Sequence, residues 1–466
     1  MSDTETLIIG GGISGLSCAA VLRARHPPDS GRLRVLETSG QPGGKMQTDS
    51  REGFLCERGP TTMLDNVAET RALVDSLGLT PEWIPGSEIN HNRFIWRDDR
   101  RIQLPAPPHV AWKALTSPIF SPAGKLRMAL EPFAKQRAIP GESLRSFATR
   151  RLGAEACRNL LEPFATGIHA CDPTQLEVES AFPKLARAER EYGNLFPGMF
   201  KLARQLRQGA PRRKTMMRSF QDGLGRLPKR IAEELGGALS MHHHVNTIEP
   251  ANEGFRVHVE TPGGAQEILA RQVVLAVPHN VAGRILGDLP GAAGLATELR
   301  AIGLAPVAVV HIGVHTSNIS EPINGFGHLV VRGGTVRTLG SIYSSSVFPG
   351  RTPSDDIALF TNFTGGTLDP HALELSDEEL TAFVTKDLEA AVGLRGDPDF
   401  THVTRWPEAF PQYHVGHFAR CERIRRHAAA IPGLILIGNY LDGLSINDCI
   451  RSATLAATGL LDAASA

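Results

Sequence analysis

A glycine-rich turn near the start of the chain constrains its fold more than any other feature. An apolar run at residues 7–9 leads into Gly10, Gly11 and Gly12, and small and apolar residues typical of a helix follow. In a strand, turn and helix of this kind, Gly10 permits the reversal, Gly12 lets the backbone approach a pyrophosphate, and Gly15 lets the helix pack on the strand. The helix N-terminus offers free amides to the anion. The pattern predicts a Rossmann-like dinucleotide site.

Two further features favour FAD as the dinucleotide. The segment RLRVLETSG is a second apolar strand that ends in Glu37, where an acidic side chain reaches the adenosine ribose. Directly after it, QPGGKMQT places Gly43 and Gly44 in a second glycine turn, followed by Lys45. An ordinary NAD domain does not need this turn, which resembles the second dinucleotide-binding motif of FAD-dependent oxidases. We therefore expect FAD, bound without a covalent link.

Charge and residue usage exclude several other classes. The chain of 466 residues carries 49 basic and 49 acidic side chains, so its net charge gives no reason to expect nucleic-acid binding. Six cysteines are scattered without metal-ligand spacing, which indicates a reducing compartment and no disulfide framework. His242, His243 and His244 are adjacent in a strand-like run, where side chains alternate between faces and cannot converge on one ion. We expect no metal site.

The dinucleotide signals recur in separated stretches of the chain, so the fold is expected to be α/β with a discontinuous FAD-binding domain. Apolar runs such as PVAVVHIGV and IALFTNFT predict a β-sheet substrate domain, and amphipathic patterns predict a helical, membrane-associating or core-forming insert. The expected division is an FAD-binding domain at 1–85, 211–288 and 421–466, a substrate-binding domain at 86–109 and 289–420, and the insert at 110–210.

Seven stretches, collinear from the first strand to the last helix, together resemble the protoporphyrinogen oxidases, a family with the FAD-dependent amine-oxidase fold. They are IIGGGISGL, NRFIWRDDRRIQLP, FATGIHACDPTQLEVESAFP, INGFGHLV, LGSIYSSSVFP, PQYHVGHF and LSINDCIRSA. Each piece alone is unspecific, whereas the ordered set is highly specific. The resemblance implies oxidation of protoporphyrinogen IX to protoporphyrin IX, with hydride transfer to FAD and reoxidation by molecular oxygen to hydrogen peroxide.

The resemblance also implies the residues that bind the cofactor. It assigns the adenosine diphosphate half of FAD to the two glycine turns and Glu37, and the adenine region to the backbone of Val245. The last turn and helix would face the flavin, because amides at a helix N-terminus stabilise negative charge on the reduced ring. The predicted set is Gly10, Gly11, Gly12, Ile13, Ser14, Gly15, Glu37, Gly43, Gly44, Lys45, Gly59, Pro60, Thr61, Val245, Gly438, Ile446, Asn447 and Asp448.

For the substrate, the resemblance assigns Arg93 to a propionate of the tetrapyrrole, since a guanidinium pairs with a carboxylate through two hydrogen bonds. Apolar side chains would sandwich the macrocycle, although such residues in strands more often form a core. The remaining predicted substrate residues are Ala170, Cys171, Phe326, Leu329, Ile342 and Phe363.

The chain departs from the family pattern at His169 and Cys171, which replace an aromatic residue and a glycine, and at Tyr440, which replaces a smaller residue. The Cys171 side chain would narrow a place where backbone alone is expected near the substrate, so the identity of the porphyrinogen stays open. For His169, a pocket-lining or core histidine is more typical than a general base.

The implied chemistry needs few titratable groups, because the methylene bridges of a porphyrinogen give up hydride while the pyrrole nitrogens stabilise the cation. The protein then has to hold the macrocycle in a dry slot against the flavin. The sequence shows neither paired carboxylates nor a Ser-His-Asp pattern, and we predict no catalytic side chain. Three alternatives stay open: a coproporphyrinogen III oxidase, an FAD-dependent amine oxidase, and a flavin- and porphyrin-binding protein without turnover.

The sequence leaves several partners open. No apolar stretch reaches the 18 or more residues of a membrane span, so we expect a cytoplasmic protein. Peripheral contact with the inner face of the cell membrane stays open, because a segment around Trp112 and Phe120 would suit an interface or equally close a helical core. The oligomeric state also stays open, with a homodimer as one possibility.

Overall fold

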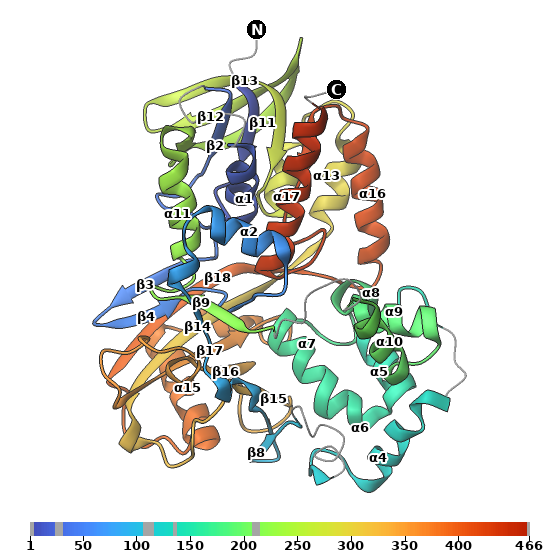
Figure 1. Cartoon of the computed structure of the whole chain (residues 1–466), viewed down its shortest axis with the longest axis vertical. Coiled ribbons are helices and arrows are strands. Elements are labelled where there is room, and N and C mark those ends of the chain that lie inside the picture. Colours follow the sequence, from blue (N-terminus) through green and yellow to red (C-terminus); the bar gives the residue numbers. More distant parts are fainter. Residues whose placement is uncertain (1–3, 24–30, 106–115, 134–137, 207–214, 464–466) are drawn as a thin grey trace.

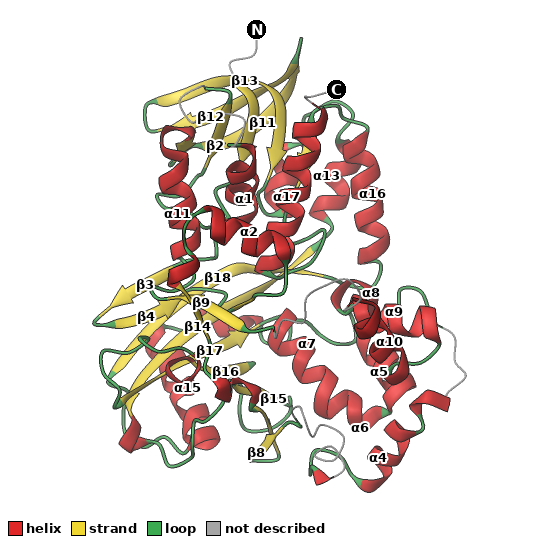
Figure 2. Cartoon of the chain, viewed as in Figure 1, coloured by secondary structure: helices red, strands yellow, loops and turns green. Residues whose placement is uncertain are grey.

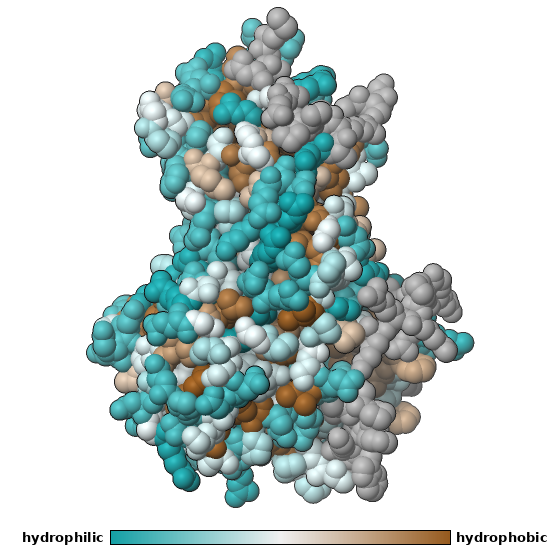
Figure 3. Space-filling model, turned by 60° about the vertical axis from the view of Figure 1, so that its left-hand side comes forward, coloured by the Kyte–Doolittle hydropathy of each residue, from teal (hydrophilic) through white to brown (hydrophobic). Residues whose placement is uncertain are grey.

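The computed structural model describes residues 4–23, 31–105, 116–133, 138–206 and 215–463. Figure 1 shows one sheet with its helices in the upper part of the molecule, a second sheet below it, and a group of helices from α4 to α10 beside the second sheet. Sheets and helices are mixed throughout (Figure 2), which confirms the expected α/β class. The face turned forward in Figure 3 is mainly hydrophilic, with hydrophobic residues in small separate patches.

The first sheet joins strands from the beginning, middle and end of the described chain. Its order is β10-β2-β1-β13-β12-β11, with β19 paired to β13, and the strands around β1 run parallel. The bounds are β1 Thr4–Ile9, β2 Leu33–Leu36, β10 Leu239–Ser240, β11 His244–Ala251, β12 Gly254–Thr261, β13 Gly264–Leu275 and β19 Leu434–Leu436. The apolar runs of β1 and β13 are buried because helices cover both faces of the parallel strands.

Alternate residues of β1 divide between the two faces of this sheet. Ile8 packs in one core cluster with α1 (Ile13–Leu22), α11 (Arg226–Leu235) and α17 (Ile446–Ala463). Leu7 and Ile9 pack in the other cluster with α12 (His279–Ile285), α13 (Ala293–Arg300) and α16 (His417–Ala429). The expected strand, turn and helix at the N-terminus are therefore present, with the strand beginning at Thr4, before the apolar run at residues 7–9. Tyr440 lies fully buried in the second cluster.

The second sheet has the order β18-β14-β17-β16-β15-β7-β8. Its bounds are β7 Arg93–Arg97, β8 Arg100–Gln103, β14 Gly303–His315, β15 Gly327–Val330, β16 Gly340–Tyr343, β17 Ile357–Gly365 and β18 Phe400–Gln412. One face packs its apolar side chains against α15 (Asp377–Val392), in a cluster that includes Val310, Phe360 and Leu388. The opposite face is left for contact with the rest of the molecule.

The predicted helical insert consists of short helices that pack around a core shared with Ile95 of β7 and Ile102 of β8. The bounds are α4 Pro122–Ala129, α5 Leu144–Leu152, α6 Ala154–Ala156, α7 Glu162–His169, α8 Val178–Ala181, α9 Pro183–Tyr192 and α10 Phe196–Leu206, with a π-helix at Cys157–Leu161. Phe120 is buried in this core, whereas Trp112 lies outside the described residues. Within the described part of the chain, no helix is both long and apolar enough to traverse a bilayer.

An ion pair that is closed to solvent lies inside the insert. The guanidinium of Arg151 pairs with the carboxylate of Glu131, and both side chains are 0% exposed. Its Nε lies 3.5 Å from Glu189, which is only 3% exposed. Glu131 also accepts a hydrogen bond from the Leu195 amide at 2.8 Å. The pair therefore joins η4 (Glu131–Phe133), α5, α9 and the start of α10.

We expect Arg151→Met to destabilise the insert strongly, because it leaves the Glu131 carboxylate buried without its cation, whereas Glu189 keeps its ion pair with Arg150. Loss of one partner from a buried pair costs about 3–5 kcal/mol. The control is Arg187→Ala, at an exposed pair with Glu191, where a surface ion pair contributes about 0.5 kcal/mol or less. Urea unfolding followed by circular dichroism measures both. Equal unfolding midpoints for Arg151→Met and the unchanged protein would contradict the assigned role.

Candidate active site

The first glycine turn has the geometry of a phosphate site. Gly10 has a φ of +113°, and a Cβ there would lie 2.6 Å from the Ala276 carbonyl oxygen. A Cβ at Gly15 would lie 2.0 Å from the Gly10 carbonyl oxygen, so the helix and turn are in contact. A Cβ at Gly12 would meet nothing within 4 Å, and no side chain caps the helix that begins at Ile13. The turn thus leaves open space directly before a free helix N-terminus.

The second glycine turn lies against the first. The Gly43 amide donates a hydrogen bond of 2.8 Å to the Gly11 carbonyl, and a Cβ at Gly44 would lie 3.3 Å from the Gly12 Cα. Lys45 follows, half-buried, with its pKa lowered by desolvation and Glu408 acting in the opposite direction. The two motifs that the sequence singled out are therefore parts of one concave surface.

Glu37 lies at the end of β2, beside this surface. Its carboxylate accepts hydrogen bonds from the Gly11 amide at 2.7 Å and the Ser39 amide at 2.8 Å. The His243 amide donates to the Glu37 carbonyl at 2.9 Å, which brings the start of β11, and the buried Val245, to the same end of the sheet.

The side chains of His242, His243 and His244 do not converge on one point, because His243 contacts the Met241 carbonyl and His244 contacts Thr38.

The start of α17 supplies a second helix N-terminus. The Asn447 side chain donates to the Leu64 carbonyl at 2.8 Å and accepts from Thr70 at 2.9 Å. Asp448 pairs with Ser445 and Arg451, each within 2.8 Å. Because these side chains are engaged within the protein, an interaction of this helix with a cofactor would come from its backbone dipole at Ile446 and Asn447. Gly438 follows β19 and lies against the Tyr440 ring.

These features fit a dinucleotide cofactor. The open space at Gly12 and the free amides of α1 suit a pyrophosphate, and Glu37 is placed for a ribose. The chain from Gly59 to Thr61 connects the glycine turns with the second sheet. At one end, a Cβ at Gly59 would lie 2.6 Å from the Lys45 carbonyl oxygen. At the other end, Thr61 lines a small cavity together with Ile342 of the second sheet. The cofactor surface and the second sheet therefore meet at Thr61.

The register of the second sheet puts most predicted substrate residues on one face. Arg93 pairs with Gly327, which pairs with Ile342 on the next strand. Two residues further along β15, Leu329 pairs with Gly340 of β16, and Gly340 pairs with Phe363 of β17. Directly paired residues point to the same face. Arg93, Leu329, Ile342 and Phe363 thus share the face opposite α15.

Three predicted residues lie at the border of this face. Phe326 precedes β15, and its ring lies 5.3 Å from the Arg93 guanidinium. Ala170 ends α7 in a left-handed conformation and packs in a cluster that includes Phe363. Cys171 is buried in the core of the insert rather than on a cavity wall, and burial raises its pKa to about 12.

His169 is a core residue, as expected. It is 6% exposed and packs against the rings of Phe182 and Tyr413. Burial lowers its pKa to about 4, so it is neutral near pH 7. It does not line the large cavity described next.

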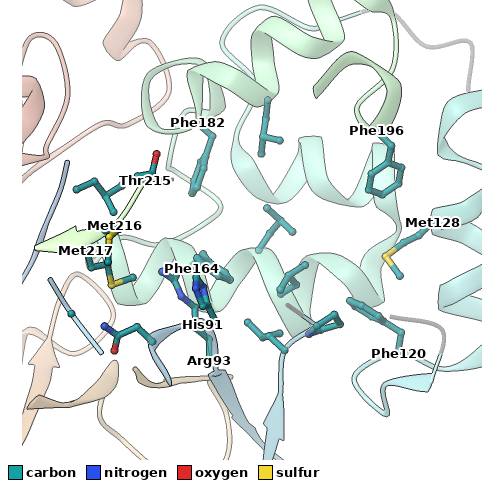
Figure 4. A pocket seen from close by; sticks show the side chains of 18 of the residues that line it. His91, Arg93, Phe120, Met128, Phe164, Phe182, Phe196, Thr215, Met216 and Met217 are labelled. Carbon is teal, nitrogen blue, oxygen red and sulfur yellow. The ribbon is translucent and has the colours of Figure 1, made fainter. Parts of the chain in front are cut away.

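A cavity of about 1030 Å³ lies between Arg93 and the helical insert. Figure 4 shows His91 and Arg93 at one wall and Phe164 on the insert helix that faces them. The sequence indicated Arg93 as a site residue, but it did not indicate the residues of the other walls. Those residues come from amphipathic helices and from β9 (Met217–Phe220). The lining residues are Leu64, Gly86, Ser87, Glu88, Asn90, His91, Arg93, Leu104, Pro105, Phe120, Lys125, Met128, Ala129, Leu160, Leu161, Phe164, Phe182, Leu185, Phe196, Thr215, Met216 and Met217.

Arg93 is a partly desolvated basic side chain at the wall of this cavity. Its side chain is accessible because it borders the cavity, yet the surrounding protein desolvates it and lowers its pKa. Within the described residues, no carboxylate forms an ion pair with it, and the Phe326 ring lies against it. A desolvated guanidinium of this kind favours an anionic ligand.

Comparison with known proteins identifies relatives over nearly the whole chain. The family described as flavin containing amine oxidoreductase matches residues 13–461. Protoporphyrinogen oxidase 1, chloroplastic, from Arabidopsis thaliana is 33% identical, over 97% of this chain and 86% of its own. Coproporphyrinogen III oxidase from Bacillus subtilis (strain 168) is 28% identical, over 99% of both chains. A solved structure from Exiguobacterium sp. 255-15 has a TM-score of 0.81 at 24% identity and covers 99% of both chains.

Two glycine substitutions separate cofactor binding from folding. We expect Gly12→Ala to leave the melting temperature of the FAD-free protein unchanged, because its Cβ enters open space, and to weaken FAD binding. A loss of about tenfold in Kd corresponds to about 1.4 kcal/mol. Gly15→Ala should lower the melting temperature itself, since its Cβ meets backbone.

Flavin fluorescence titration and thermal unfolding measure the two effects. Gly237→Ala is the matched control, because its Cβ also meets nothing within 4 Å but the residue lies far along the chain, after α11. Unchanged FAD affinity in Gly12→Ala would contradict the assignment of the pyrophosphate to this turn.

Proposed function

The chain belongs to the family of flavin-containing amine oxidoreductases and is an FAD-dependent oxidase, and we propose that its substrate is protoporphyrinogen IX. The product would be protoporphyrin IX, with molecular oxygen as the final acceptor and hydrogen peroxide as its product. The observation that carries the proposal is the desolvated Arg93, which lacks a carboxylate partner among the described residues and borders a large apolar cavity. Relatives named as porphyrinogen oxidases support it.

The cavity suits a tetrapyrrole in size and chemistry. At about 1030 Å³ it is at the upper end of ordinary ligand pockets, which span about 300–1,000 Å³. Its walls are dominated by Phe, Leu and Met side chains, which match the apolar rim of the macrocycle. Arg93 would pair with a propionate in this cavity. Leu329, Ile342 and Phe363 share the sheet face of Arg93 but do not line the cavity, and they would contact the part of the ring system that extends beyond it.

In this proposal the protein acts by holding its ligands and excluding water. FAD, when bound, accepts a hydride from a methylene bridge of the porphyrinogen. The two glycine turns would hold its pyrophosphate and Glu37 its ribose, while the N-terminal dipole of α17 would stabilise negative charge at its reduced end. Arg93 would fix the orientation of the macrocycle, because a bidentate pair sets direction as well as affinity.

Protoporphyrinogen is favoured over coproporphyrinogen by the small number of cations among the described residues that line the cavity. Protoporphyrinogen carries two propionates and coproporphyrinogen four. The described lining residues supply Arg93, His91 and Lys125 as basic side chains, and the acidic Glu88 partly offsets them. Burying four carboxylates with so few partners would be unfavourable.

An amine oxidase is disfavoured because many amine oxidases of this fold place a lysine near the flavin on a strand of the substrate sheet. Residues 300–319 of this chain, which include β14, contain no lysine.

We also propose the three-part division of the chain expected from its sequence, with peripheral contact of the insert with one membrane leaflet. Leu126, Leu130 and Phe133 are 62%, 50% and 77% exposed, and Phe196 and Phe200 are 51% and 72% exposed. Large apolar side chains gathered on short helices suit insertion at the boundary of headgroups and acyl chains. The insert also forms a wall of the cavity. An apolar substrate could therefore pass directly from the membrane into the cavity.

The first test of the proposed function is oxidation of the substrate in air. Purified protein with FAD should raise porphyrin fluorescence from protoporphyrinogen IX faster than from coproporphyrinogen III, after subtraction of spontaneous oxidation. Faster oxidation of coproporphyrinogen III would transfer the assignment to that substrate. No acceleration of either, in a protein yellow with FAD, would contradict the proposal.

A second test examines Arg93. Because a charge-assisted hydrogen bond contributes about 1.5–3 kcal/mol, Arg93→Ala should lower kcat/KM by about 10- to 100-fold, mainly through KM. Arg93→Lys should recover part of the loss, since it restores charge without the bidentate geometry. The exposed Arg100 on β8 offers a control, Arg100→Ala, that should change neither parameter. Equal KM values for Arg93→Ala and the unchanged enzyme would contradict the assigned role.

A further inference from the structure

A buried carboxyl group lies beside the proposed site. Glu57 ends β4 (Phe54–Glu57) and is 5% exposed. One carboxyl oxygen accepts a hydrogen bond from the Leu224 amide at 2.8 Å, and the other accepts one from the Thr48 hydroxyl at 2.7 Å. Burial raises its pKa to about 7, against the opposing effects of Arg351 and of these hydrogen bonds. The group is therefore present in both protonation states near neutral pH.

A small cavity connects this carboxyl group with the substrate face of the second sheet. It has a volume of about 10 Å³, close to the space that one water molecule requires. Its polar walls include Glu57, Arg351 and Thr61. Ile342, which shares a sheet face with Arg93, lines the same cavity. A single water in this space would have Glu57, Arg351 and Thr61 as polar neighbours.

Arg351 is a fixed cation beside Glu57. Arg351 is 2% exposed, and backbone carbonyls and Ser219 hold its guanidinium at 2.8–3.0 Å. The other charged or titratable groups around Glu57 come from the strand and turn segments packed on it. They are Asp49 with its partners Arg58 and His402, Asp222, Cys56 and His311. Burial raises the pKa of Cys56 to about 12 and lowers that of His311 to about 3, so both are neutral near pH 7.

We propose that Glu57, acting through one water in this cavity, is the proton acceptor of the porphyrinogen oxidation. The inference rests on the proposed function. When hydride leaves a methylene bridge with its electron pair, the macrocycle gains one positive charge. A pyrrole N–H bond then breaks, its electron pair returns to the ring, and the proton passes through the water to the Glu57 carboxylate. The hydride and this proton together account for the two hydrogens of the peroxide formed in each cycle.

The decisive variant is Glu57→Gln, which keeps the shape and a carbonyl acceptor but takes up no proton. In the unchanged holoenzyme, kcat should rise with pH through an apparent pKa near 7, because the carboxylate form is required. In Glu57→Gln this acid limb should vanish and kcat should fall by about 100-fold or more, whereas KM and FAD affinity stay unchanged. The same pH profile in both enzymes would overturn the inference.

A matched control separates this role from a structural one. Thr48→Val removes a hydrogen bond to the same carboxyl group but leaves the proton acceptor in place, so its acid limb should persist. If Glu57→Gln does not fold, Glu57→Asp carries the test: retraction by one methylene should lower kcat and retain the acid limb. Loss of the limb in Thr48→Val, or full kcat in Glu57→Asp, would contradict the relay.

Infrared titration gives a readout that is independent of turnover. A carboxyl band that titrates near pH 7 should be present in the unchanged protein, with and without FAD, and absent in Glu57→Gln. If all carboxyl groups titrate with ordinary pKa values, which for Glu is about 4.3, the inference is overturned and the proposed function stays intact. Failure of the unchanged enzyme to oxidise any porphyrinogen would instead overturn both.

Discussion

The hydrogen bond from the Gly43 amide to the Gly11 carbonyl joins two turns from separate parts of the chain, and the site is built outward from this junction. With Gly12 and Gly44 in contact, the backbone forms one concave surface before the N-terminus of α1. A phosphate held there fixes one end of an extended cofactor. We propose that α17, which the Asn447 side chain joins to the Leu64 carbonyl, sets the position of the flavin end.

The second sheet and the insert complete this frame in a different way. Sheet register places Arg93, Ile342 and Phe363 on one face, and the insert closes the space in front of Arg93 with apolar side chains. Inside the insert, Arg151 and Glu131 neutralise each other away from solvent. The result is a largely apolar cavity with few cations among its described lining residues, in which we propose that one desolvated guanidinium orients the ligand.

Local sequence signals predicted the parts of the fold that depend on local chemistry. The glycine turns, Glu37 and the apolar strands needed no tertiary information, since turn geometry and strand burial leave direct marks in the sequence. Helix α15 was not predicted, although Ser376 and Glu379 form a capping box that signals its start. The cavity walls at Phe164 and Met216 were missed, because helical periodicity does not distinguish a core side chain from one that lines a cavity. Glu57 gave no signal, because its burial arises from Leu224 and Arg351, distant in sequence.

Anaerobic mixing of the holoenzyme with protoporphyrinogen IX tests most directly whether this site transfers hydride from a porphyrinogen to FAD. We expect loss of the oxidised-flavin absorbance at a rate at least equal to that of steady-state turnover, and its recovery when oxygen is admitted. Flavin that stays oxidised with protoporphyrinogen IX and coproporphyrinogen III, but is reduced by an amine, would show that the site does not act on porphyrinogens.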